Sequence, residues 1–203
     1  MGDYSGDMAT HSTESTTEPR DRARAAAPVY TRTAIALHWI AALLIVCNLA
    51  LGVTMINLAL SPFTLRLYAW HKWIGITVFL TAAARLAWRW AHPAPPAVAM
   101  SAWRRRVAAG THAALYVLML AIPLSGWVYS SSTGVSVVYL GLVPLPDLVG
   151  KDKALAGVLK AVHAALNFTL LALVCVHVGA ALRHHAADRN GVLPRMLPFL
   201  RPD

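Results

Sequence analysis

The chain has 203 residues, of which 57% are hydrophobic and 13% are charged, and its mean hydropathy is +0.52. A soluble domain carries about 25% charged residues, so this composition indicates a membrane protein and argues against a soluble enzyme. The formal net charge of +9 would suit nucleic-acid binding, but the arginines flank apolar segments, where they act as membrane anchors and topology signals. We therefore expect a lipid bilayer, and no nucleic acid, as a partner.

The chain begins with a polar tail, residues 1–28, whose alternating charges and prolines predict a disordered cytoplasmic segment. Four apolar segments follow, each near the length of about 20 residues that a helix needs to cross a bilayer. The expected spans are about 33–57, 66–90, 106–130 and 159–183.

The second of these spans is interrupted by charge. Only twelve uncharged residues separate Lys72 from Arg85, so this segment crosses only if both side chains extend toward opposite interfaces. With this span included, the sequence predicts an all-α fold in which residues 29–200 form an integral membrane four-helix bundle.

The connection 131–150 is rich in Ser, Gly and Pro. Its apolar piece Val135–Val143 is too short to cross a bilayer, so we expect it at the surface. Cys47 and Cys175 each lie within an apolar stretch, and we interpret both as small buried packing residues.

Four spans place both termini on one side of the membrane. Twelve arginines lie near that side, four each from the tail, the connection between the second and third spans, and the C-terminus; five Lys or Arg residues lie in the two opposite connections. By the positive-inside rule, both termini are expected to be cytoplasmic.

Four histidines inside the spans pair by depth, His38 with His177 near the cytoplasmic face and His71 with His163 near the opposite face. Histidine is expensive in hydrocarbon and usually marks function there. His163 and His177 are fourteen residues apart, which is roughly 21 Å along a helix and returns to nearly the same face.

Two histidines at each depth favour haem over zinc. Zinc prefers four protein ligands, whereas a b-type haem needs two axial imidazoles because its porphyrin supplies four nitrogens. The chain has no Cys-x-x-Cys-His run for covalent haem attachment. We predict two non-covalent b-type haems, and we favour His38 and His177 on the iron near the cytoplasmic face and His71 and His163 on the iron near the opposite face.

Further polar residues lie at the cytoplasmic level. His112 competes with His38 and His177 for two axial positions; we favour contact with a haem propionate or a quinone, and the alternative is an interfacial histidine without a partner. Arg85 and Arg89 are candidates for propionate or quinone contacts, because guanidinium binds carboxylates bidentately, although membrane anchoring explains them equally well. A further pair, His184 and His185, is interpreted as solvated at the interface, with quinone protonation as the alternative.

Several segments carry a family pattern: Tyr30-Thr31-Arg32 through Leu37-His38-Trp39, His71-Lys72 with Gly75, Arg85 with Pro93-Ala94-Pro95-Pro96, Thr111 to Tyr116, and His163 and His177 followed by Ala180-Ala181-Leu182, His184-His185 and Asp188 to Pro198. On these segments the chain resembles the bacterial cytochrome b561 family over about residues 29–200. The resemblance implies a transmembrane domain with two b haems on the four histidines named above. It also implies a multi-pass protein of the inner membrane of a Gram-negative bacterium that exchanges electrons with ubiquinone.

One branch of that family resembles a superoxide oxidase, which implies a periplasmic donor, superoxide or a protein, and an oxidoreductase or a pure electron carrier. An alternative is the membrane-anchor cytochrome subunit of a larger dehydrogenase or hydrogenase. An alternative from another class is a haem or metal-ion transporter. A transporter predicts discontinuous helices around a midplane site, whereas these histidines lie near the two surfaces.

Overall fold

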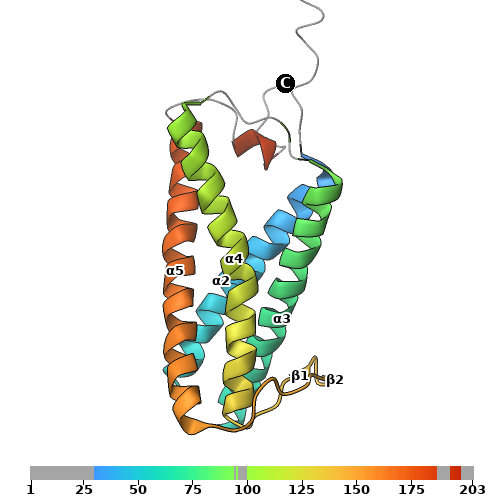
Figure 1. Cartoon of the computed structure of the whole chain (residues 1–203), viewed down its shortest axis with the longest axis vertical. Helices are drawn as coiled ribbons and strands as arrows, with labels where there is room; N and C mark the ends of the chain where they lie inside the picture. Colours follow the sequence, from blue (N-terminus) through green and yellow to red (C-terminus); the bar gives the residue numbers. More distant parts are fainter. Residues whose placement is uncertain (1–29, 94, 96–99, 187–192, 198–203) are drawn as a thin grey trace, which may run out of the picture.

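The structure is a computed structural model that describes residues 30–93, 95, 100–186 and 193–197. It consists mainly of four long helices, α2 (Arg32–Ile56), α3 (Pro62–Ala91), α4 (Ala102–Ser132) and α5 (Lys153–Ala186). They run side by side as an elongated bundle (Figure 1). The predicted disordered tail, residues 1–28, lies outside the described residues.

Both ends of the described chain lie at one end of the bundle, which we call the termini end (Figure 1). The short 3-10 helix η1 (Leu193–Arg195) is fixed there, because Trp39 Nε1 of α2 donates a hydrogen bond of 2.9 Å to the carbonyl of Met196. This arrangement agrees with an even number of crossings.

Local sequence signals explain where two of the helices begin. The Thr31 side chain accepts a hydrogen bond of 3.2 Å from the Ala34 N–H and caps α2. Ser61 caps α3 in the same way, and Pro62 occupies its first position, where the missing N–H costs nothing. Pro123 lies inside α4, and its missing N–H leaves a carbonyl of the preceding turn without its usual donor.

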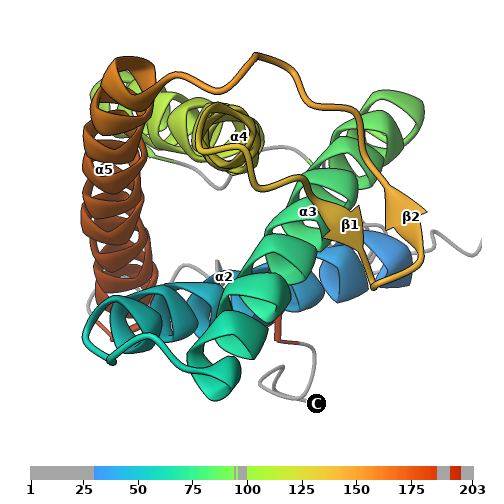
Figure 2. The same cartoon turned by 90° about the horizontal axis from the view of Figure 1, so that it is seen from below.

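The connection between α4 and α5 contains the one departure from an all-helical fold among the described residues. Strands β1 (Val138–Tyr139) and β2 (Val143–Pro144) pair antiparallel. Trp73 Nε1 of α3 donates to the Val138 carbonyl at 2.7 Å, and the Tyr139 hydroxyl lies 3.0 Å from Thr77 Oγ1. The hairpin is therefore fastened to the outer side of α3 (Figure 2), at what we call the hairpin end. The apolar piece Val135–Val143 lies at the surface, as expected from its length.

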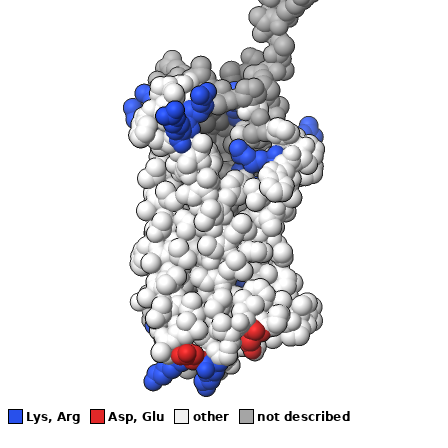
Figure 3. All heavy atoms as spheres, in the orientation of Figure 1, with Lys and Arg blue, Asp and Glu red and all other residues white. Residues whose placement is uncertain are grey.

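Among the described residues, α2, α4 and α5 are long and apolar enough to cross a membrane. Helix α3 is as long as α4 within one residue, but Arg66, Lys72, Arg85 and Arg89 interrupt its apolar surface. On the face shown in Figure 3, Lys and Arg side chains gather at the two ends and a broad band free of charge separates them.

The buried core forms a layer between the two ends. It contains Ala41, Ile45, Val78, Ala82, Leu118, Met119, Ile122 and Leu170, two or three residues from each helix except α5. Many large apolar side chains point outward instead, as lipid-facing helices require. The expectation that Cys47 and Cys175 are buried is wrong, because both thiols are exposed on the outside of the bundle and neither forms a disulfide.

Candidate functional site

The bundle brings the intramembrane histidines together at two levels. At the hairpin end, the rings of His71 (α3) and His163 (α5) have centroids 6.2 Å apart and planes at 83°. At the termini end, His38 (α2) and His177 (α5) are 6.3 Å apart with planes at 64°. His112 (α4) lies 5.2 Å from His177. We call these the hairpin-end pair and the termini-end cluster.

The separations within the two levels suit different roles. Two imidazoles that bind one metal ion from opposite sides, through bonds of about 2.0 Å, place their ring centroids roughly 6 Å apart. The His71–His163 and His38–His177 separations agree with this value. The shorter His112–His177 separation does not, so His112 fits better as a neighbour of the second pair.

The tautomer of His112 follows from its hydrogen bond. Its Nδ1 lies 2.7 Å from the Ala108 carbonyl, and a carbonyl only accepts, so Nδ1 carries the proton. The neutral ring then has a lone pair on Nε2, which is free to accept a proton or a hydrogen bond from a bound group.

Glycines face both imidazoles of the hairpin-end pair. A Cβ on residue 52 of α2 would lie 3.3 Å from His71 Cε1, and a Cβ on residue 126 of α4 would lie 3.0 Å from His163 Cε1. Carbon atoms in ordinary contact are about 3.5–4.0 Å apart. Gly52 and Gly126 therefore leave the space in which the two rings are seated.

These glycines repeat the spacing of the histidines. Gly52 follows His38 by fourteen residues, and Gly126 follows His112 by fourteen. Each of α2 and α4 thus presents a histidine at one level and a glycine on the same face at the other. Sequence reasoning missed both glycines, although the fourteen-residue spacing that revealed the histidine pairs would have found them.

Replacing Gly126 with alanine is expected to weaken cofactor retention at the hairpin-end pair about tenfold, because the added methyl group pushes the His163 ring from its seat. Gly110→Ala on the same helix is the matched control, since nothing lies within 4 Å of its added Cβ. Elsewhere in a helix this substitution stabilises by roughly 0.5–1 kcal/mol. Haem loss to apomyoglobin, followed optically, measures the difference; equal loss rates for the two variants would contradict the seating role.

Three buried side-chain atoms in the described part of the chain have no hydrogen-bond partner: Asn48 Oδ1, His71 Nδ1 and Arg85 Nη1. Buried polar atoms are almost always paired, so each exception calls for an explanation. Asn48 packs against Gly75, one turn from His71, and Arg85 lies at the termini end. Of the three, Arg85 Nη1 is a donor that a carboxylate of a bound group at the termini end would satisfy.

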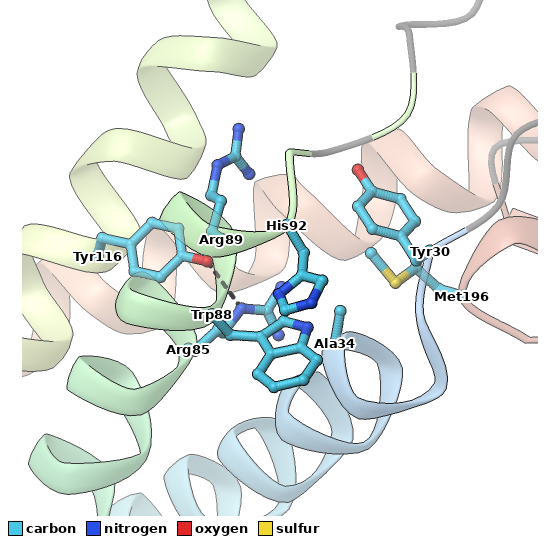
Figure 4. A pocket seen from close by; sticks show the side chains of 8 residues that line it. All are labelled: Tyr30, Ala34, Arg85, Trp88, Arg89, His92, Tyr116 and Met196. Atoms are coloured by element: carbon cyan, nitrogen blue, oxygen red, sulfur yellow. Dashed lines mark hydrogen bonds between the residues drawn. The ribbon is translucent and has the colours of Figure 1, made fainter.

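Arg85 lines a small pocket at the termini end. Its Nε donates a hydrogen bond of 2.8 Å to the Tyr116 hydroxyl (Figure 4). Arg89 also lines the pocket, and its guanidinium extends away from this contact. Tyr30, Ala34, Trp88, His92 and Met196 complete the lining. Two guanidinium groups make the pocket suitable for carboxylates.

The remaining described histidines at this end are His92, which lines the pocket, and the adjacent His184 and His185. His92 stacks on Trp88, with ring centroids 4.1 Å apart and planes at 11°. His184 and His185 lie in the last turn of α5 and are not among the residues that line the pocket.

The donor set at each level suits a b-type haem. Across the described ranges, no three His, Cys, Asp or Glu side chains converge to hold one metal ion. Two imidazoles are too few for a structural zinc site but complete the coordination of an iron that already has four porphyrin nitrogens. The space that Gly52 and Gly126 leave for the two rings, the buried Arg85 Nη1 and the guanidinium pocket fit such a group with its two carboxylates.

Comparison with known proteins agrees with this chemistry. The family described as prokaryotic cytochrome b561 matches residues 29–199. Cytochrome b561 homolog 2 of Escherichia coli (strain K12) is 32% identical over 164 residues, which cover 80% of this chain and 87% of that protein. Cytochrome b561 homolog 1 of the same strain is 29% identical and covers 83% and 97%.

A third relative, named "Probable superoxide oxidase CybB" in Yersinia pestis, is 29% identical over 178 residues, with coverage of 85% and 97%. The family match covers far more than half of the chain. The chain therefore belongs to the prokaryotic cytochrome b561 family, and it is a b-type, electron-carrying cytochrome of a bacterial membrane.

Proposed function

We propose that the chain carries electrons between a periplasmic donor at the hairpin end and ubiquinone, and that it holds two b-type haems to do so. His71 and His163 would bind one haem, and His38 and His177 the other. The observation that carries this proposal is the presence of two imidazole pairs with centroid separations of 6.2 and 6.3 Å. Helix α5 contributes one member to each pair, fourteen residues apart.

A b haem held by two imidazoles supplies one-electron oxidation and reduction without an open coordination position on the iron. The chain contributes the imidazoles, their spacing of roughly 21 Å along α5, and the apolar layer between the two levels. This layer, formed by residues such as Ile45, Val78 and Ile122, excludes water and ions from the middle of the bundle.

At the termini end, the side chains are arranged to bind carboxylates. Tyr116 accepts the Nε–H of Arg85, which leaves the buried and unpartnered Nη1 to donate to a propionate. Arg89 lines the same pocket. His112, with its Nε2 lone pair, is placed to contact a propionate or a quinone.

At the hairpin end, basic residues outnumber acidic ones. The two connections and helix ends there carry Arg66, Lys72, Lys151, Lys153 and Lys160, against Asp147 and Asp152. Asp152 caps α5 by accepting from the Ala154 and Leu155 N–H groups, so its charge is engaged locally. A basic rim raises the local concentration of small anions, which supports superoxide as the donor, as does the name of the Yersinia pestis relative.

The proposed placement is a multi-pass protein of the inner membrane, with residues 29–200 as its membrane domain. All four helices would cross, α3 with Lys72 and Arg85 extended toward opposite interfaces. The termini end would face the cytoplasm, because twelve arginines flank it and five basic residues lie in the opposite connections.

Rapid mixing of the oxidised protein with superoxide tests the proposal. The b-type absorbance bands should appear as each superoxide gives up one electron and becomes dioxygen, and a ubiquinone analogue should then reoxidise the protein. Superoxide dismutase in the mixture should abolish the reduction. If dithionite reduces the protein but superoxide does not, superoxide is not the donor, and the membrane-anchor alternative with a protein donor is favoured.

A further inference from the structure

We propose that Ser125 of α4 is a positioning residue that fixes the tautomer and orientation of His163. This inference rests on the proposed role of His163 as an axial ligand. Helix α4 would then influence the hairpin-end pair, although neither imidazole of that pair comes from it.

Two hydrogen bonds determine the protons at this position. Ser125 Oγ donates to the Ile122 carbonyl at 2.7 Å, which uses the only hydroxyl proton. The same oxygen lies 2.9 Å from His163 Nδ1, and the Ile122 backbone is a second hydrogen-bond partner of this imidazole. Since a carbonyl only accepts and the hydroxyl proton is already used, the ring presents an Nδ1–H group to these oxygens. The His163 ring is consequently protonated on Nδ1, and its Nε2 lone pair is directed away from Ser125 and available to a metal.

The adjacent residue restricts the ring further. Gly126 leaves space for the His163 Cε1 edge, since a Cβ there would lie 3.0 Å away. Ser125 is thus hydrogen-bonded to the Nδ1 side of the His163 ring, and the absence of a side chain on Gly126 leaves room for the Cε1 edge of that ring. The two residues together fix the ring in both position and rotation.

The opposite imidazole of the pair has a different environment. His71 Nδ1 is buried, no hydroxyl among the described residues accepts a hydrogen bond from it, and its polar neighbour is the Asn48 backbone. The two rings of the hairpin-end pair therefore differ, and the Ser125 hydrogen bond acts on only one of them.

A hydrogen bond from Nδ1–H to an acceptor raises the basicity of a ligating imidazole. A more basic imidazole stabilises ferric iron more than ferrous iron, because the ion with the higher charge gains more from donation of the nitrogen lone pair. Loss of the acceptor should shift this preference about tenfold toward ferrous iron, which raises the one-electron potential of the hairpin-end haem by about 59 mV.

The experiment is a spectroelectrochemical titration of Ser125→Ala, with the two haem potentials resolved, together with electron paramagnetic resonance spectra of the ferric protein. Ser125→Thr keeps the hydroxyl and should restore the wild-type potential and spectrum. Thr169→Ala is the matched control, because Thr169 Oγ1 also donates to a carbonyl within its helix, that of Ala165, but contacts no imidazole.

We expect Ser125→Ala to raise one potential, leave the other unchanged and alter one of two ferric signals. The inference is overturned if Ser125→Ala keeps both haems with unchanged potentials and spectra, or if Ser125→Thr behaves like Ser125→Ala. A different result tests the proposed function: if His163→Ala leaves both haems in place, His163 is not a ligand and the premise itself fails.

Discussion

Replacing His163 with alanine is expected to lower the haem content of the purified protein from about two to about one per chain. In the proposed function, this imidazole is one of the two that would hold the haem at the hairpin-end pair, and no group of three His, Cys, Asp or Glu side chains converges among the described residues to replace it. His71→Ala should give the same result. A pyridine haemochromogen assay with a protein determination measures the ratio.

His185→Ala is the control for these variants, because His185 lies exposed in the last turn of α5 and should leave the haem content unchanged. Full haem content in both His71→Ala and His163→Ala would show that the hairpin-end pair holds no iron. Circular dichroism distinguishes a folded variant that has lost one haem from a variant that has lost its haem because it is unfolded. In a folded variant, the remaining haem should keep its wild-type potential.

The second large effect distinguishes the three histidines at the termini end. His38→Ala should remove the haem at this level, whereas His112→Ala should retain it, because only the 6.3 Å separation of His38 and His177 suits a shared iron. His112 lies 5.2 Å from His177, and its loss should change the rate of quinone reduction or the haem potential instead. Haem content and ferric spin state, measured on both variants, test this assignment.

The opposite pattern, with haem lost in His112→Ala and kept in His38→Ala, would reverse the assignment and make His112 the ligand. Equal retention in both would mean that either histidine can serve with His177. Each outcome is visible in the same two purified proteins, so the comparison needs no knowledge of the physiological donor.

The histidine levels could be predicted from the sequence for a clear physical reason. A membrane confines the chain to long helices, so sequence separation converts directly into depth. Fourteen residues between His163 and His177 define both a distance and a common face on one helix. With two levels known, His38 and His71 could be matched to them by their distance from the ends of their own segments.

Features that depend on contacts between helices could not be predicted from the sequence. The space that Gly126 leaves for the His163 ring and the hydrogen bond that Ser125 accepts from His163 depend on how α4 is rotated against α5, which no single-helix pattern determines. The β-hairpin depends on contacts of Val138 and Tyr139 with α3, far apart in the chain. Cys47 and Cys175 were expected to be buried because both stretches are apolar, yet in a membrane helix an apolar surface also faces lipid.

The number of haems bound by the wild-type protein tests the central claim most directly. Purified protein, assayed by pyridine haemochromogen and quantitative amino-acid analysis, should contain about two non-covalent b haems per chain, because two pairs of imidazoles are available. A fully folded sample that binds one haem or none after reconstitution with excess haem would contradict the account of two stacked sites.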